Sequence, residues 1–397
     1  MLVNYQISYH QSPRFLALTL CICLLQSPVW AAQGPDSWPG GEASRIDITQ
    51  AGMSSNLSGA VWNPETKKLW LVSNTGYVWR MSCPGNCLQS SYWAIDDEGA
   101  AYWNIGGDAE SIAQADLGQA NTVFIGIEQA NSTNQRLIRE YTLSPGKGPG
   151  SATNEWNLVE MRLGDNNQGL EALTFVPDEW LISAGFVDQN NQPYTGSQYG
   201  TGGLFFAGLQ GSGADIFVFD LNRNVQGEYT FIGRYDVGQT EIAGLEFDRS
   251  DGVLYTWHNY GNSGGSGNPD ILQAVGLSPS GSGSIKSLPV LGSWYGPRIH
   301  NNEGIALVPN EQCNNAATRN FFLTTDDGGT ADSLGIYPQF PTTYFPDEDS
   351  DGVADCEDAC PGTRATTPVN EQGCELTPTP TATISPPVTA TPSASPT

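Results

Sequence analysis

The sequence predicts an all-β protein whose body is a β-propeller of five blades. A short sequence motif, called the phrase below, occurs five times along the chain, and each copy is followed by a β-rich apolar run. The 397 residues also include 46 Gly, 11 Trp, 15 Tyr and 14 Phe. Such a composition favours strands and turns over helices.

Each copy of the repeated phrase carries apolar residues around a second position that varies. The copies lie at residues 57–62, 109–113, 170–175, 242–247 and 302–307. Their second positions, Ser58, Glu110, Glu171, Ala243 and Glu303, recur at intervals of 52 to 72 residues. Five units of this length, built from short strands without helical periodicity, are typical of propeller blades.

Further strands are expected after each phrase. Second strands are predicted at 68–73, 122–127, 179–183, 253–257 and 320–325. Third strands are predicted at 77–81, 136–141 and 215–219, and fourth strands at 156–161 and 229–233. The surplus segment 45–49 would complete the last blade and close the ring, which removes exposed edges.

The propeller is expected to span residues 44–340. Six blades remain the alternative, because the long interval between Glu171 and Ala243 could hide another unit.

Residues 1–31 are predicted to be a secretory signal peptide cleaved near Ala31. The apolar run Phe15–Leu25 is too short to span a bilayer and is followed by small residues. Cys21 and Cys23 lack the small preceding residue of a lipoprotein signal, so a secreted or cell-surface protein is expected. No other apolar stretch has the length of a membrane helix, and residues 376–397, rich in Thr, Pro and Ser, form an extended tail.

Six cysteines lie outside the predicted signal peptide. An even number of cysteines in an exported protein indicates disulfides. The predicted pairs are Cys83–Cys87, Cys360–Cys374 and Cys313–Cys356.

The charge balance bears on the kind of partner. The chain has 42 Asp and Glu against 16 Lys and Arg, a formal net charge of −26. So few basic residues argue against a nucleic-acid-binding protein, because the chain has too few positive charges to neutralise phosphate groups. We expect a monomer that binds a small molecule or a cell-surface ligand.

Acidic residues recur where inner strands of a propeller would meet. Glu110, Glu171 and Glu303 occupy the second position of three phrases, and Glu128 follows a second strand. Deprotonated carboxylates gathered near one axis need a cation or shared protons, and oxygen ligands favour Ca²⁺ over Mg²⁺. The sequence therefore predicts a calcium site formed by these four glutamates. The alternative is that the acids cap strand ends or bind backbone amides of neighbouring blades.

These phrases, with Asp108-Ala-Glu110 and Phe124-Ile-Gly-Ile-Glu128, resemble the SdiA-regulated family and the esterase-like domains related to β-propeller phytase. The resemblance implies a propeller, a calcium site at one end of its channel and metal-assisted hydrolysis. Ser58 and Ala243 depart from the acidic pattern. His258, Arg298 and His300 are the residues that would then face substrate, although His258 could instead be a packing residue and Arg298 could pair with surface acids.

Residues 345–375 are expected to form a separate calcium-binding spacer. Their acidic run matches the thrombospondin type 3 repeat, D-x-D-x-D-G-x-x-D-x-x-D-x-C-P. Alternating carboxylates around Gly352 can wrap one ion. The predicted ligands are Asp347, Asp349, Asp351, Asp355 and Asp358.

Together these observations predict a secreted, calcium-binding propeller of the bacterial cell exterior. It would be a metal-dependent phosphoesterase or esterase. The alternative is a non-catalytic ligand-binding or adhesion module whose calcium is structural.

Overall fold

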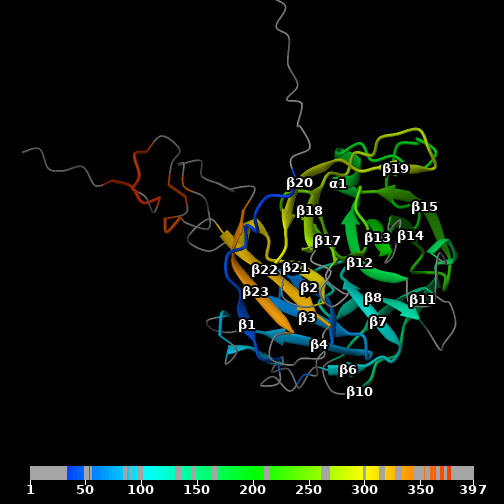
Figure 1. Cartoon of the computed structure of the whole chain (residues 1–397), viewed down its shortest axis with the longest axis horizontal. Helices are drawn as coiled ribbons and strands as arrows, with labels where there is room; N and C mark the ends of the chain where they lie inside the picture. Colours follow the sequence, from blue (N-terminus) through cyan, green and yellow to red (C-terminus); the bar gives the residue numbers. More distant parts are fainter. Residues whose placement is uncertain are drawn as a thin grey trace, which may run out of the picture. The chain divides into compact units, whose positions relative to one another are not determined.

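The computed structural model describes most of the predicted propeller and a few positions after it. The described residues are 34–48, 53, 56–83, 87–89, 92–95, 102–129, 136–144, 148–161, 169–209, 215–260, 269–297, 301–312, 318–326, 333–342, 353, 358–360, 362–363, 367–370 and 373–376. Within them, five mainly antiparallel sheets surround one axis (Figure 1). The prediction of a five-bladed β-propeller is confirmed.

Each blade begins with an inner strand that contains the repeated phrase. The inner strands are β2 (Leu57–Asn63), β7 (Asp108–Ala113), β12 (Leu170–Pro177), β16 (Ile242–Asp248) and β21 (Asn302–Leu307). Each of them contacts the inner strands of the two neighbouring blades, so that the five form a closed ring.

The remaining strands follow outward in chain order in four blades, whereas the last blade takes its fourth strand, β1, from the N-terminal side of the propeller. The second strands are β3 (Lys68–Ser73), β8 (Thr122–Gln129), β13 (Gly203–Leu209), β17 (Val253–His258) and β22 (Thr318–Thr325). The third strands are β4 (Tyr77–Ser82), β9 (Leu137–Thr142), β14 (Ile216–Leu221), β18 (Ile271–Val275) and β23 (Leu334–Pro341). The fourth strands are β6 (Tyr102–Asn104), β11 (Asn154–Asn157), β15 (Tyr229–Asp236), β20 (Val290–Tyr295) and β1 (Ser44–Ile46).

Short elements decorate this frame. They are β5 (Ala94–Ile95), β10 (Gly148–Pro149), β19 (Ile285–Ser287), the helix α1 (Asp178–Ser183) and the 3₁₀ helices η3 (Val159–Met161) and η4 (Asn310–Gln312). Among the described residues, no helix is long and apolar enough to cross a membrane.

The N-terminal strand closes the ring, as the sequence predicts. β1 pairs antiparallel with β23, with Ser44 opposite Ile336 and Ile46 opposite Leu334 (Figure 1). The last blade therefore contains strands from both ends of the propeller, and its edge is covered.

The predicted second strand at 179–183 is wrong. These residues belong to α1, and the second strand of that blade is β13. Asp178 and Glu179 lie in the first turn of α1, where carboxylates stabilise the helix dipole. Asp178 also accepts hydrogen bonds from the Tyr194 hydroxyl at 2.6 Å and the Ser197 amide at 3.1 Å. This helix and its loop fill the long interval before Ala243, which therefore holds no sixth blade.

In the preceding blade, the predicted strand 156–161 is shortened to β11 and followed by η3.

The hydrophobic core is divided into five wedges, each lying between two neighbouring blades. Phe124 of β8 contacts Phe205 of β13 in the next blade, with ring centroids 4.6 Å apart. Because every sheet is covered on both faces, its central strands are largely apolar, as in β14, whose six residues are all buried and include one charged residue, Asp220.

Two of the three predicted disulfides are present. Cys83 pairs with Cys87, and Cys360 pairs with Cys374. The third predicted pair, Cys313–Cys356, lies outside the described residues. So do the predicted signal peptide and residues 377–397 of the predicted tail.

A β-bulge interrupts every inner strand at the second position of the phrase. The pairing shifts at this point in all five blades, which takes the bulged residue out of the ladder. The bulged positions are Ser58, Glu110, Glu171, Ala243 and Glu303. Four of these residues line a cavity of about 10 Å³ on the axis; Glu303 is not among its lining residues.

The third position of every phrase is occupied by a small residue. These residues are Gly59, Ser111, Ala172, Gly244 and Gly304. A Cβ atom on Gly304 would lie 2.6 Å from both the Cα of Gly59 and the carbonyl oxygen of Ser58. A Cβ atom on Gly244 would lie 2.7 Å from the carbonyl oxygen of Glu303. Small side chains therefore let the backbones of neighbouring inner strands touch.

The variant Gly304→Ala tests this close approach. The new methyl group must displace backbone of the first blade, so we expect the free energy of unfolding to fall by about 1–3 kcal/mol. Urea denaturation measures the change. The matched variant Gly283→Ala meets its nearest atom at 3.4 Å and should stay within about 0.5 kcal/mol of wild type. Equal stability of the two variants would contradict the packing argument.

The variant Ile46→Ala tests the closure by β1. Ile46 is fully buried between the last and first blades, so its truncation should cost about 2–5 kcal/mol in the same measurement. Ile182 on α1 is 49 % exposed, and Ile182→Ala serves as the control with little expected loss. A loss no larger for Ile46→Ala than for the control would show that the closing strand contributes little.

Candidate functional site

One end of the channel gathers carboxylates from three blades. Glu110, Glu171 and Glu303 come from the bulges of β7, β12 and β21, and Glu128 comes from the end of β8. All four side chains are buried. The charge of Glu303 reaches both Glu110 and Glu171 strongly enough to raise their pKa values. We call this end the carboxylate mouth.

The tightest group in the carboxylate mouth is formed by Asp108, Glu110 and Glu128. One carboxylate oxygen from each lies within 4.8 Å of the others. Calcium binds oxygen at about 2.3–2.6 Å, so that oxygens on opposite sides of the ion are about 5 Å apart. The three carboxylates are therefore close enough together to contact one divalent cation.

Local structure explains how these side chains are held. Asp108 follows a turn at Gly106 and Gly107, whose φ angles of 63° and 87° favour glycine. The Glu128 carboxylate accepts a hydrogen bond of 2.8 Å from the backbone N–H of Gly169. The buried Arg136 guanidinium donates to the carbonyl oxygen of Glu128 at 2.7 Å. The glycine turn thus positions Asp108, and the contacts with Gly169 and Arg136 position Glu128.

Burial and mutual repulsion weaken the acidity of the glutamates. Burial is the largest cause of the raised pKa of Glu110, followed by the charges of Asp108 and Glu303. Burial also raises the pKa of Glu171, and the charges of Glu110, Glu128 and Glu303 add to it. Without a cation, neighbouring carboxylates must share protons; a bound cation would replace those protons.

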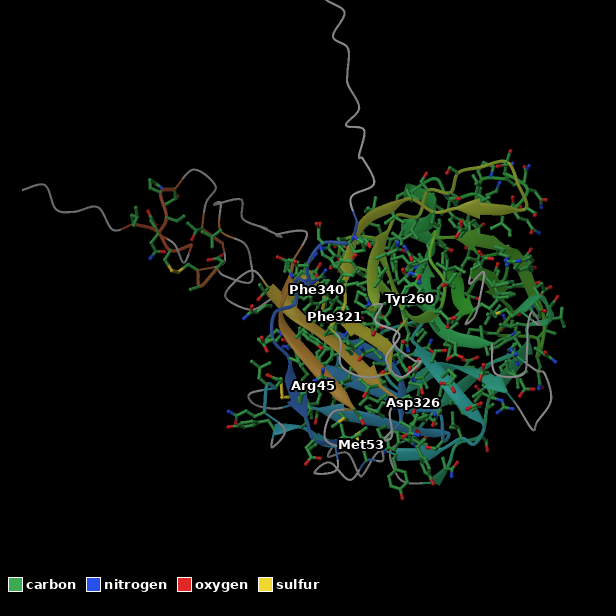
Figure 2. All side chains as sticks on the ribbon, viewed as in Figure 1. Arg45, Met53, Tyr260, Phe321, Asp326 and Phe340 are labelled. Carbon is green, nitrogen blue, oxygen red and sulfur yellow. A yellow bond between two sulfur atoms is a disulfide. The ribbon has the colours of Figure 1, made fainter. Side chains whose placement is uncertain are left out.

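The opposite side of the carboxylate mouth has an acidic residue, Asp270, that the sequence argument missed. Asp270 is buried just before β18, and its carboxylate accepts hydrogen bonds from Asn302 Nδ2 at 2.7 Å and the Tyr260 amide at 3.1 Å. Asp270 and Asp326 both raise the pKa of Glu303, although burial is the larger cause. Tyr260 and Asp326 lie toward the middle of the ring (Figure 2). The repeated phrase and the apolar run after it mark only the first and second strands of each blade. Asp270 precedes a third strand, so no repeated pattern pointed to it.

His258 is fully buried with both ring nitrogens engaged. Nε2 lies 2.8 Å from Thr256 Oγ1, and Nδ1 lies 2.9 Å from the carbonyl oxygen of Thr240. Burial lowers the pKa of His258 to about 4, so the ring is neutral at physiological pH. These contacts favour the packing interpretation of His258 over an acid–base role.

Several predicted site residues lie outside the described residues. They are Arg298, His300, Asp347, Asp349, Asp351 and Asp355. Asp358 is described, and its carboxylate accepts a hydrogen bond of 2.7 Å from the backbone N–H of Cys360. The ligand set expected for the spacer therefore stays a prediction.

Comparisons with known proteins leave the family open. No protein-family model matches the chain, and no curated protein sequence matches it. Among the similar solved structures is a luciferin-regenerating enzyme, with 10 % identity over 78 % of this chain and 86 % of that chain and a TM-score of 0.37.

Two further solved structures are similar to this chain over part of their length. The Dos1 propeller has 9 % identity over 74 % of this chain and 59 % of that chain, with a TM-score of 0.34. Sqt1 of Chaetomium thermophilum, bound to the N-terminus of ribosomal protein L10, has 14 % identity over 67 % of this chain and 57 % of that chain, with a TM-score of 0.31. The chain thus covers less than two thirds of these two structures. Similarities this low carry no argument about function, and the blade assignment rests on the strand pairing.

Metal-free protein should lose stability as the pH rises from the unfolded glutamate pKa near 4.5. The raised pKa values of Glu110 and Glu171 mean that the folded state binds protons more tightly than the unfolded state, so deprotonation disfavours folding. The double variant Glu110→Gln/Glu171→Gln should therefore melt above wild type at pH 8 in EDTA, with the difference shrinking toward pH 4.5. His258 titrates in the opposite sense but is present in both proteins. A difference that is constant with pH would refute the assignment.

Proposed function

We propose that the protein is an exported calcium-binding propeller that holds its ion at the carboxylate mouth. The observation that carries the proposal is the group of the half-buried Asp108 and the buried Glu110 and Glu128, whose oxygens lie within 4.8 Å of one another. Glu171 interacts with Glu128 and Glu110 and would complete the ligand set. Hard oxygen ligands without cysteine or histidine suit calcium.

The proposed ion also accounts for the cost of burying these groups. Carboxylates removed from water lose their hydration, and each one disfavours the ionised form of its neighbours. A divalent cation would offset both effects at once. Glu303 is farther around the ring, beside Asp326 and Asp270, and would add to the negative potential that attracts the ion.

Ligand binding is the role that this ion would support best. Calcium takes 6–8 oxygen ligands, so a few carboxylates leave coordination positions for water or for a ligand. Asp108 is only half-buried, which would leave the ion accessible from one side. We therefore propose that the ion binds an anionic oxygen, a phosphate or carboxylate, of a small molecule or cell-surface ligand.

Hydrolysis of phosphoesters or simple esters is the second candidate function. The same accessible side could admit a water molecule, whose pKa a bound metal would lower. Among the described residues, however, His258 has both nitrogens engaged and offers no acid or base to such a reaction. This is why binding without turnover is placed first.

Export and a second calcium site belong to the same proposal. Residues 1–31 would direct secretion, and the disulfides Cys83–Cys87 and Cys360–Cys374 suit an oxidising compartment. Residues 345–375 would bind calcium through Asp347, Asp349, Asp351, Asp355 and Asp358 and act as an ordered spacer.

Calcium-dependent melting separates the two proposed sites. A deletion of residues 347–374 should keep a calcium-induced rise in melting temperature, because the ion at the carboxylate mouth remains. At a concentration 100 times Kd, binding adds about 2.7 kcal/mol of stability. Adding Glu110→Gln/Glu171→Gln to the deletion should abolish the rise. The control Glu65→Gln/Glu179→Gln removes two exposed carboxylates and should leave it unchanged.

Loss of all calcium sensitivity in the deletion alone would overturn the site at the carboxylate mouth. A hydrolysis screen with phosphomonoesters, phytate and simple esters then tests the second candidate. Under the binding proposal, calcium-loaded protein turns over none of them. Turnover that disappears in Glu110→Gln/Glu171→Gln would replace ligand binding by hydrolysis as the function of the same ion.

A further inference from the structure

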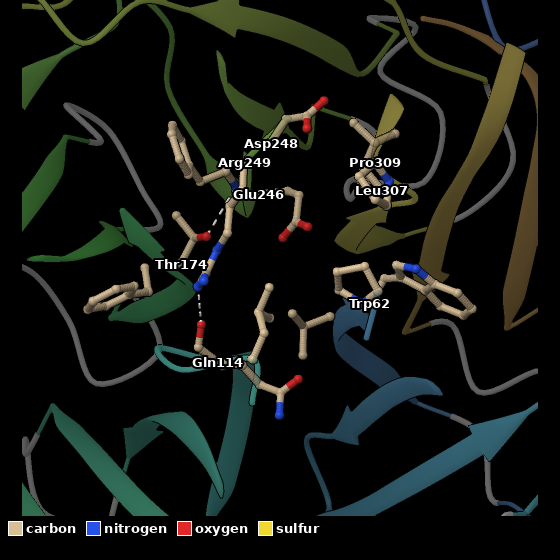
Figure 3. Close-up of a pocket in the computed structure, with 13 residues that line it drawn as sticks. Trp62, Gln114, Thr174, Glu246, Asp248, Arg249, Leu307 and Pro309 are labelled. Carbon is tan, nitrogen blue, oxygen red and sulfur yellow. Dashed lines mark hydrogen bonds between the residues drawn. The ribbon is translucent and has the colours of Figure 1, made fainter. Parts of the chain in front are cut away.

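The end of the channel opposite the carboxylate mouth has a pocket formed by all five blades. The carboxylates lie at the starts of the inner strands, whereas this pocket is lined by residues at or just after the strand ends (Figure 3). Its volume is about 50 Å³. One water needs roughly 10–15 Å³ on this scale, so the pocket has room for a few waters or one small group.

Glu246 presents the charge in this pocket. Its carboxylate points toward the middle of the pocket (Figure 3). A hydrogen bond from the backbone N–H of Leu307 to this carboxylate lowers the pKa of Glu246. Neighbouring charges have other contacts. Asp248 forms a buried ion pair with Arg319, and Arg249 Nη2 donates to the carbonyl oxygens of Gln114 and Ala115 at 2.6 and 3.1 Å.

The surroundings of the pocket favour a cation. Arg249 is approached by Glu246, Glu179, Asp116 and Glu65, all of which act on its pKa in the same direction. Four carboxylates around one guanidinium leave a negative local field. Burial raises the pKa of Glu246 and the charge of Asp248 adds to it, whereas the charges of Arg249 and Arg319 lower it.

The walls of the pocket are largely apolar. Trp62, Leu117 and Leu307 come from three different blades and line the pocket together with Glu246. Phe175 lies beneath the Arg249 guanidinium, 5.6 Å from ring centroid to Cζ. A ligand that matches this lining has a positive end and a short hydrocarbon part.

We propose that this pocket binds a small primary alkylammonium group. The ammonium pairs with the Glu246 carboxylate, and the alkyl part packs against Trp62, Leu117 and Leu307. Charge-assisted hydrogen bonds of this kind are about twice as strong as neutral ones. The group can belong to a free aliphatic amine or to a lysine side chain of a partner protein. The site uses none of the residues of the carboxylate mouth and stands without the calcium proposal.

Isothermal titration of the full chain with n-propylammonium at neutral pH tests the site. Wild type should bind it saturably, in calcium and in EDTA alike, and should not bind propionate. Glu246→Gln keeps the shape but removes the charge, so binding should weaken about tenfold or more. Glu311→Gln removes an exposed carboxylate in η4, at the same end but outside the lining, and should change binding by less than about twofold.

Leu117→Trp gives an independent variant, because it fills the half-buried wall without touching the charge of Glu246. It should abolish binding while thermal melting confirms a folded protein. A second titration with Nα-acetyllysine amide distinguishes the sources: binding assigns the pocket to lysine side chains, and failure assigns it to free amines. Absence of n-propylammonium binding, equal binding by Glu246→Gln, or equal binding of propionate would overturn the proposal.

Discussion

The close approach of five inner strands around one axis is the constraint on which the rest of the structure depends. Gly59, Gly244 and Gly304 bring neighbouring backbones to distances that a Cβ atom would forbid. A bulge beside each small residue takes the preceding side chain out of the ladder. The close backbone packing and the bulge together place one residue of each blade near the axis, irrespective of the residue type.

This geometry explains how an electrostatically costly cluster can exist. Three of the five bulged positions are glutamates, and the blades hold them close although Glu303 raises the pKa of Glu110, and both raise the pKa of Glu171. Five apolar wedges between blades supply the stability that offsets this repulsion. Because the inner strands share one direction, their far ends form a separate pocket with its own acid, Glu246. The same five inner strands thus form two chemically different sites, the carboxylate mouth at their starts and the pocket with Glu246 at their far ends.

Much of this arrangement could be predicted from the sequence, and its failures have physical causes. The phrases located all five inner strands, and the surplus segment at 45–49 located the closing strand β1. The segment 179–183 was assigned to a strand because a short apolar run has no distinctive period. Its acids stabilise α1 instead. His258 follows the register of Glu128, yet its ring is enclosed by Thr240 and Thr256, whose positions only folding defines.

By itself the sequence determined the propeller class, the position of each inner strand and the acidic residues that recur there, because a repeat records local structure in every copy. The structure was needed to exclude a sixth blade, because the long interval before Ala243 holds α1 and its loop. Only the tertiary structure decided which residues share a site. Asp108, Glu110 and Glu128 form one group, Asp270 joins the other side, and Glu246 occupies the far end. These neighbours come from different strands and blades, and distances between them depend on how the sheets close into a ring, which no local pattern specifies.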